Sequence, residues 1–166
     1  DEAGNTLFPW KLHTMKNGLR VGIVGIVTDY VNIWEKEENL KGIHITDPFE
    51  AAKNALAQMK EQTDLTICIY HGGFECDLES GETLSQTTEN VGYRMCKELD
   101  FDILLTGHQH MSVPGRDISG TYTVQPCDNA KEYQYLEVTM TDHEKSIRSE
   151  LRQSDAAKGT VLADKY

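Results

Sequence analysis

Three short apolar segments, separated by two stretches with helical spacing, constrain the fold of this chain more than any other feature of its sequence. The segments span residues 20–28, 65–70 and 103–106, and the first is apolar on both faces, which is typical of a central strand covered on both sides. Helices are expected between them, at 48–62 and 89–99. This order predicts right-handed crossovers and a parallel sheet. The predicted fold class is therefore α/β, with a mixed, mostly parallel sheet.

Local signals support the start of this arrangement. Asn17-Gly18 lies between candidate strands at 12–16 and 19–28, and Asn-Gly readily takes the positive φ angles of a two-residue hairpin turn. The first helix has its own start signal, because Asp47 can cap it and Pro48 suits its first position.

The second half of the chain carries weaker signals. Residues 121–125 and 133–141 are expected to be antiparallel strands that close the sheet edge. The polar segment from Asp142 onward is expected to be an exit helix or a linker. We therefore place one domain at 1–141, and at 142–166 a connection toward a further domain.

The charge of the chain limits its partners. Acidic residues outnumber basic residues by 27 to 16, and the net charge is -11. The basic residues are scattered, which argues against a nucleic acid polymer or an anionic membrane as partner. An anionic small substrate fits only where a metal ion reverses the local field. The sequence has neither an apolar run near the roughly 20 residues that cross a bilayer nor a signal peptide, so we expect a soluble chain with any export signal upstream.

Three histidines follow the apolar segments where parallel strands are expected to end. His71 follows the second segment, and His108 and His110 follow the third, on either side of Gln109. Parallel α/β sheets bind ligands beyond the carboxyl ends of their strands, and imidazole is the commonest protein ligand for transition metals. A lone strand-end histidine more often bonds a nearby backbone group, so the three together carry the hypothesis of a metal site.

The spacing of the paired histidines bears on the number of ions. If the loop is locally extended, His108 and His110 point to the same side, with α-carbons about 6 to 7 Å apart. Imidazole binds a metal at about 2.0 to 2.1 Å, so this spacing favours two neighbouring ions over one. Gly72 and Gly73 would let the backbone pass close to an ion or a phosphate.

Other polar clusters favour plainer interpretations. A solvated or structural role is favoured for three further histidines, His13, His44 and His143. A solvated loop is favoured over oxygen ligands for the acidic residues Glu75, Asp77, Glu79 and Glu82. No C-x-x-C spacing occurs, so ordinary thiols are favoured over a zinc cluster or disulfides for Cys68, Cys76, Cys96 and Cys127.

Several motifs occur in a fixed order along residues 7–141. They are residues 17–25 (NGLRVGIVG), Asp47-Pro48 with Glu50-Ala51-Ala52, His71-Gly72-Gly73, Glu89-Asn90 and Gly107-His108-Gln109-His110. This order resembles the calcineurin-like metallophosphoesterases, and more closely the branch of 5'-nucleotidases and 2',3'-cyclic-nucleotide 2'-phosphodiesterases.

The resemblance implies half of a four-layer α-β-β-α sandwich, in which two divalent metal ions, such as Mn, Zn or Fe, lie between two sheets. It implies that His71 and His108 bind one ion and His110 the other, and it assigns no catalytic residue in this chain. The D-x-H, G-D-x-x-D and G-N-H motifs of the family do not occur here. The chain therefore resembles the C-terminal part of a catalytic domain. Its expected partner is the missing N-terminal half, and its uncovered sheet face favours self-association.

The resemblance implies that the parent protein hydrolyses nucleotide or cyclic-nucleotide phosphate esters. It also implies a location outside the cytoplasm, where relatives are often found. The isolated chain is expected to be inactive. A second interpretation is a non-catalytic binding or structural module that retains the fold, with a merely polar turn at 107–110. A complete single-metal hydrolase is less favoured, because the three histidines lack an identified carboxylate or nucleophile.

Overall fold

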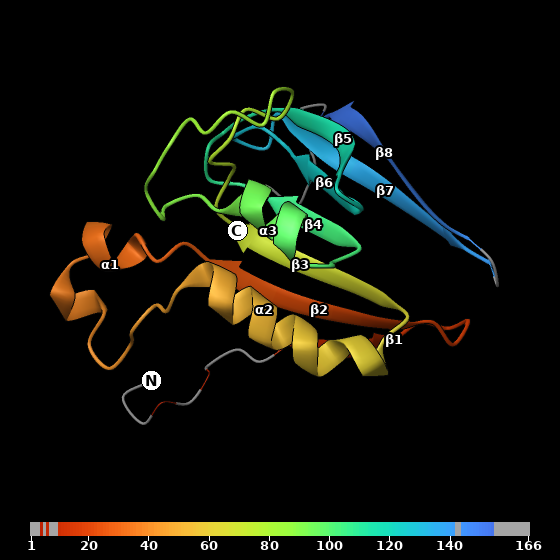
Figure 1. Ribbon diagram of the computed structural model, residues 1–166, viewed down its shortest axis with the longest axis horizontal. Helices are drawn as coiled ribbons and strands as arrows, with labels where there is room; N and C mark the ends of the chain where they lie inside the picture. The colour runs from red at the N-terminus through yellow and green to blue at the C-terminus, as the bar shows by residue number, and fades with distance from the viewer. Residues whose placement is uncertain (1–3, 5, 7–9, 142–143, 155–166) are drawn as a thin grey trace, which may run out of the picture.

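The computed structural model describes residues 4, 6, 10–141 and 144–154 (Figure 1). A six-stranded sheet with the order β1-β2-β3-β4-β6-β5 forms its centre. The strands are β1 (Lys11–Thr14), β2 (Arg20–Val27), β3 (Leu65–His71), β4 (Ile103–Thr106), β5 (Val113–Ile118) and β6 (Thr121–Gln125). Strands β2, β3, β4 and β6 run parallel, while β1 and β5 are antiparallel edges. The predicted mixed, mostly parallel α/β fold is confirmed.

Helices α2 (Pro48–Met59) and α3 (Gly92–Glu98) lie on the same side of this sheet (Figure 1). Helix α2 starts as predicted, because the Asp47 carboxylate accepts a hydrogen bond from the Glu50 backbone N–H at 2.9 Å. Helix α3 starts three residues later than expected. Its first turn is capped from the preceding loop, where the Glu75 carboxylate accepts from the Tyr93 and Arg94 N–H groups. One acidic residue of that loop therefore stabilises the helix start.

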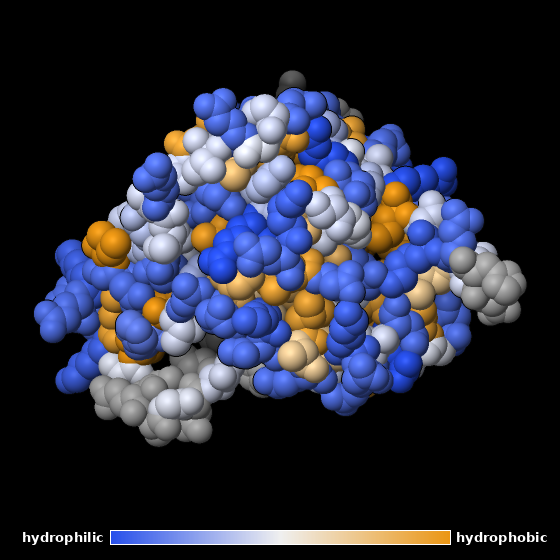
Figure 2. All heavy atoms as spheres, viewed as in Figure 1, coloured by the Kyte–Doolittle hydropathy of each residue, from blue (hydrophilic) through white to orange (hydrophobic). Residues whose placement is uncertain are grey.

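The remaining helical elements are short. They are α1 (Val31–Trp34) and the 3-10 turns Glu37–Asn39 and Lys60–Gln62. No helix in the described ranges is long and apolar enough to span a membrane. On the face viewed in Figure 2, hydrophobic side chains form patches separated by hydrophilic ones.

A hairpin covers part of the opposite face of the sheet. Strands β7 (Glu132–Met140) and β8 (Lys145–Gln153) form a separate two-stranded sheet. The hairpin side chains that pack onto the central sheet are Leu136, Val138, Met140 and Ile147. They contact a cluster centred on Val21, Leu65 and Ile103, at the amino half of the parallel strands.

Three expectations for the second half of the chain are wrong. Residues 121–125 pair antiparallel with β5 but parallel with β4 and do not form the sheet edge, and β7 pairs antiparallel with β8 outside the central sheet. Residues 145–153 form β8 instead of an exit helix or linker, because Ile147 and Leu151 alternate with exposed residues on a strand that is covered on one face. Residues 142–143 and 155–166 lie outside the described residues, so the domain boundary after residue 141 stays a prediction.

The turn between β1 and β2 is longer than expected. The Met15 N–H donates to the Leu19 carbonyl at 2.8 Å, and the Gly18 N–H donates to the Met15 carbonyl at 2.9 Å. Gly18, but not Asn17, has a positive φ, of 89°. The hairpin therefore has a three-residue loop at 16–18, in which a turn is followed by a left-handed glycine.

The β7–β8 hairpin leaves the carboxyl half of its sheet face open. Leu65, Ile67, Ile69 and His71 share this face, because alternate residues of a strand point to the same side. The hairpin covers the first two, whereas Ile69 is 48% exposed. Val27, which lies beside His71 in the strand register, is 42% exposed. His71 therefore stands at the end of an apolar strip that the described residues do not cover.

Candidate functional site

Two of the predicted histidines lie side by side at the carboxyl edge of the sheet. His71 is the last residue of β3, and His108 follows β4 by two residues. Their ring centroids are 5.3 Å apart, with the planes tilted by 57°. Partial burial lowers the pKa of His71, and the nearby His108 and His110 lower it further. This environment favours the neutral imidazole, which is the form that binds a metal.

The backbone of the histidine loop is not extended. His108 has φ 70° and His110 has φ 57°, so both lie in the left-handed region, and the condition of a locally extended loop, on which the spacing argument for two ions depends, is not met. Histidine is among the residues enriched in this conformation, although it still costs free energy relative to the ordinary regions. Two such residues in one short loop mark a segment whose backbone is held by its surroundings.

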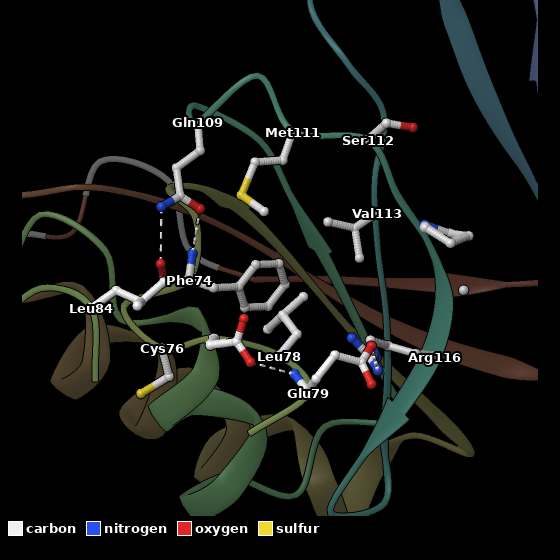
Figure 3. Close-up of a pocket in the computed structure, with 13 residues that line it drawn as sticks. Phe74, Cys76, Leu78, Glu79, Leu84, Gln109, Met111, Ser112, Val113 and Arg116 are labelled. Carbon is white, nitrogen blue, oxygen red and sulfur yellow. Dashed lines mark hydrogen bonds and ion pairs between the residues drawn. The ribbon is translucent and has the colours of Figure 1, made fainter. Parts of the chain in front are cut away.

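Gln109, between the two histidines, provides that restraint. Its Oε1 accepts a hydrogen bond from the Phe74 N–H at 2.7 Å, and its Nε2 donates to the Phe74 carbonyl at 2.9 Å (Figure 3). The Gly107 N–H also donates to the Gly72 carbonyl at 3.0 Å. The loop after β4 is therefore tied to the loop after β3 at three points, and the sequence analysis had given Gln109 no role.

The two glycines after His71 leave room for neighbouring side chains. A side chain at Gly73 would collide with the Gln109 amide, and one at Gly72 would collide with the Tyr70 ring. Both glycines are needed because protein side chains lie against them. The structure thus provides a reason for Gly72-Gly73 other than the predicted approach of an ion or a phosphate.

We expect Gln109→Leu to lower the free energy of unfolding by about 1 to 3 kcal/mol, because it removes two hydrogen bonds and leaves backbone groups of Phe74 without their partners. Urea denaturation of the variant measures the loss. Gln58→Leu, at an exposed position of α2, is the matched control. Equal stability of the two variants would contradict the restraining role of Gln109.

His108 is held by two further side chains. Its Nε2 lies 2.9 Å from Oε1 of Glu89, and its side chain is 19% exposed. Trp34 of α1 stacks on the imidazole with ring centroids 5.0 Å apart. Tyr30 contacts Trp34 edge-on at 5.8 Å. Glu89 was part of the sequence resemblance but had no role there. Trp34 gave no signal, because it lies between the candidate strand at 19–28 and the helix expected at 48–62.

Two aspartates lie near the histidines. Asp128 forms an ion pair with Lys131 at 3.1 Å, and this hydrogen bond, together with the nearby His110, lowers the pKa of its carboxyl group. Asp29, just after β2, accepts a hydrogen bond from the Thr88 hydroxyl at 3.2 Å. Within the described residues, no three His, Cys, Asp or Glu side chains are grouped closely enough to hold a metal ion by themselves.

The donors at this edge fit part of a divalent metal site. His71 and His108 are adjacent, partly exposed and provide nitrogen ligands, which suit Zn, Fe and Mn to different degrees. The remaining ligands of a complete site are not grouped with them in the described residues. Cys68 and Cys96 are unsuitable alternative ligands, because burial raises the pKa of both thiols to about 12.

A separate pocket lies beside the histidine loop and shares Gln109 with it. It has a volume of about 430 Å³ and lies between the acidic loop and β5, with Phe74, Leu78, Met111 and Val113 on its apolar walls (Figure 3). An ion pair of 2.6 Å joins Arg116 to Glu79 there. The acidic loop therefore makes local structural contacts, as the solvated-loop interpretation allows.

Comparisons with known proteins identify nucleotide phosphoesterases as relatives of this chain. No family model matches the chain. A 2',3'-cyclic-nucleotide 2'-phosphodiesterase/3'-nucleotidase of Salmonella typhimurium is 29% identical over 103 residues, which are 61% of this chain and 15% of that protein. A 5'-nucleotidase of Vibrio cholerae is 29% identical over 100 residues, or 59% of this chain and 18% of that protein. The structure of a putative 5'-nucleotidase from Staphylococcus aureus matches with a TM-score of 0.84 and 29% identity, covering 95% of this chain and 32% of that one.

The mostly parallel sheet and its helices have the fold of the metallophosphoesterases. Within that class the chain is similar to 5'-nucleotidases and 2',3'-cyclic-nucleotide phosphodiesterases, and the resemblance in its motifs is confirmed. The chain spans less than a third of the length of these relatives.

Metal binding at His108 should change the fluorescence of Trp34, because the imidazole stacked on the indole would acquire positive charge. The chain has two tryptophans, so Trp10→Phe isolates the signal of Trp34. In this background, titration with zinc should give a saturable change that His108→Ala abolishes and His13→Ala, on exposed β1, retains. A response that survives His108→Ala would place the metal elsewhere.

Proposed function

We propose that this chain is the C-terminal part of the catalytic domain of a binuclear-metal nucleotide phosphohydrolase of the 5'-nucleotidase or 2',3'-cyclic-nucleotide phosphodiesterase type. The observation that carries the proposal is the pair of imidazoles, His71 and His108, 5.3 Å apart where two parallel strands end. The related nucleotide phosphoesterases support the reaction class. An extracytoplasmic location of the parent protein is part of the same proposal.

In this proposal the histidines act as metal ligands. His71 and His108 hold one divalent ion and His110 holds the other, as the family resemblance implies. When bound, such ions supply Lewis acidity to a phosphate ester. Partial burial lowers the pKa of His71, which favours the neutral ring that can act as a ligand. Neutral imidazoles add no negative charge to the site, which helps an anionic substrate approach a chain of net charge -11.

The open part of the sheet face supports a missing half. His71 shares a face with Ile69, and both lie beyond the part that the β7–β8 hairpin covers. A second sheet packed there would bury the apolar strip and bring further ligands toward the histidines. The partner in this proposal is the N-terminal half of the same domain.

We predict that the isolated chain hydrolyses neither a 5'-nucleotide nor a 2',3'-cyclic nucleotide above background, because the ligands that would fix two ions at a short separation are supplied by the other half. The test is an assay with excess Mn or Zn, repeated after adding that half in trans. Addition should produce turnover, and His110→Ala should abolish it.

Two results would contradict this prediction. Turnover by the chain alone, lost in His110→Ala, would show a complete enzyme. The second result has two parts: the parent sequence lacks the D-x-H, G-D-x-x-D and G-N-H motifs, and adding the other half in trans gives no turnover. Together they would favour a non-catalytic module that retains the fold.

The exposed apolar strip should make the isolated chain self-associate, since burial of such surface is favourable. We expect Ile69→Thr to shift sedimentation toward the monomer in analytical ultracentrifugation. Ile33→Thr makes the same change at a 68% exposed residue of α1 and should leave association unchanged. A monomeric wild-type chain, or equal effects of the two substitutions, would contradict the role of this face.

A further inference from the structure

The contact between His108 and Glu89 determines which ring nitrogen carries the proton. Nε2 of His108 lies 2.9 Å from Oε1 of Glu89, and the two side chains are 19% and 31% exposed. An ionised carboxylate only accepts hydrogen bonds, so Nε2 must be the donor. In the neutral ring this leaves Nδ1 as the nitrogen with a free lone pair, and Nδ1 makes no hydrogen bond to any described residue.

Glu89 is held in place by the segment around it. The Tyr70 hydroxyl donates to the Glu89 carbonyl at 3.2 Å, and the buried Asn90 accepts a hydrogen bond from the Gly73 N–H at 2.7 Å through its Oδ1. The Thr88 hydroxyl donates to the carboxylate of Asp29. Three consecutive residues are thus anchored to the ends of β2 and β3. The carboxylate of Glu89 is therefore presented from a restrained backbone.

The imidazole is restrained on other sides as well. Trp34 stacks against it with the planes 29° apart, and His71 lies beside it. The left-handed backbone of His108, with φ 70°, sets the direction from which the side chain leaves the loop. A ring held in this way has little freedom to flip and exchange its two nitrogens.

We propose that Glu89 is a positioning residue for His108, whose carboxylate fixes the Nε2–H tautomer and thereby presents Nδ1 to a divalent cation. A carboxylate that accepts from the far nitrogen of a metal-binding histidine orients the ring and raises its basicity as a ligand. The inference rests on the proposed function only in taking His108 as a ligand. Loss of such a partner typically weakens metal affinity about 10- to 100-fold.

The first experiment tests the tautomer without any metal. Long-range proton–nitrogen correlation NMR of the metal-free full chain, at mildly alkaline pH, identifies which nitrogen of His108 carries hydrogen. We expect Nε2–H in the wild type, a mixture of tautomers in Glu89→Ala, and retention of Nε2–H in Glu89→Gln, whose amide oxygen can still accept the bond. Glu82→Ala, an exposed position of the same loop, is the matched control.

The second experiment measures zinc affinity by isothermal titration calorimetry. Glu89→Ala should weaken zinc binding about 10- to 100-fold, Glu89→Gln should weaken it less, and Glu82→Ala should match the wild type. Glu89→Gln keeps the shape of the side chain, so it remains informative if Glu89→Ala fails to fold.

The outcomes separate this inference from the proposed function. The role of Glu89 is overturned if His108 of the wild type is the Nδ1–H tautomer. It is also overturned if both Glu89 variants bind zinc as tightly as Glu82→Ala does. If His71→Ala still weakens binding in that case, the metal site itself stands. A wild-type chain that binds no zinc overturns the metal site, and the inference falls with it.

Discussion

The hydrogen bonds between the Gln109 amide and the backbone of Phe74 are the contact on which the histidine edge depends. A parallel sheet brings the ends of β3 and β4 to one edge, but it does not by itself fix the loops that follow them. The amide joins the two loops, and Gly73 permits the close approach. Both histidines flanking Gln109 can then hold left-handed backbone conformations, because the loop between them is pinned at its centre.

The central part of the fold could be predicted from the sequence because its signals are local. Apolar strands, helical spacing and the Asp47 cap each depend on neighbouring residues, and all three are present. Strands β5 and β8 were missed. Pro114-Gly115 in β5 has the composition of a turn, and β8 has few apolar residues because the hairpin is covered on one face only. The parallel pairing of β6 with β4 depends on the edge strand β5, so it could not be predicted once β5 was missed.

At the site, sequence reasoning found residues by their position after strands, and the structure brings His71 and His108 together. It could not find their neighbours. Glu89 is 19 residues from His108, and Trp34 lies in a segment without periodicity, so only the folded chain reveals those contacts. Spacing along the sequence could not give the loop conformation either, because the geometry around Gln109 is set by Phe74 rather than by its neighbours in the chain.

The left-handed backbone at His108 and His110 restricts how this edge can change over evolutionary time. Branched and bulky residues are costly in this conformation, whereas glycine, asparagine and aspartate adopt it readily. Asparagine and aspartate also carry oxygen atoms that can bind a metal. If the histidines bind metal as proposed, a substitution of either one by asparagine or aspartate would preserve the loop while exchanging a nitrogen ligand for an oxygen ligand. The backbone leaves open a path along which the metal preference of such a site can drift without first losing the fold.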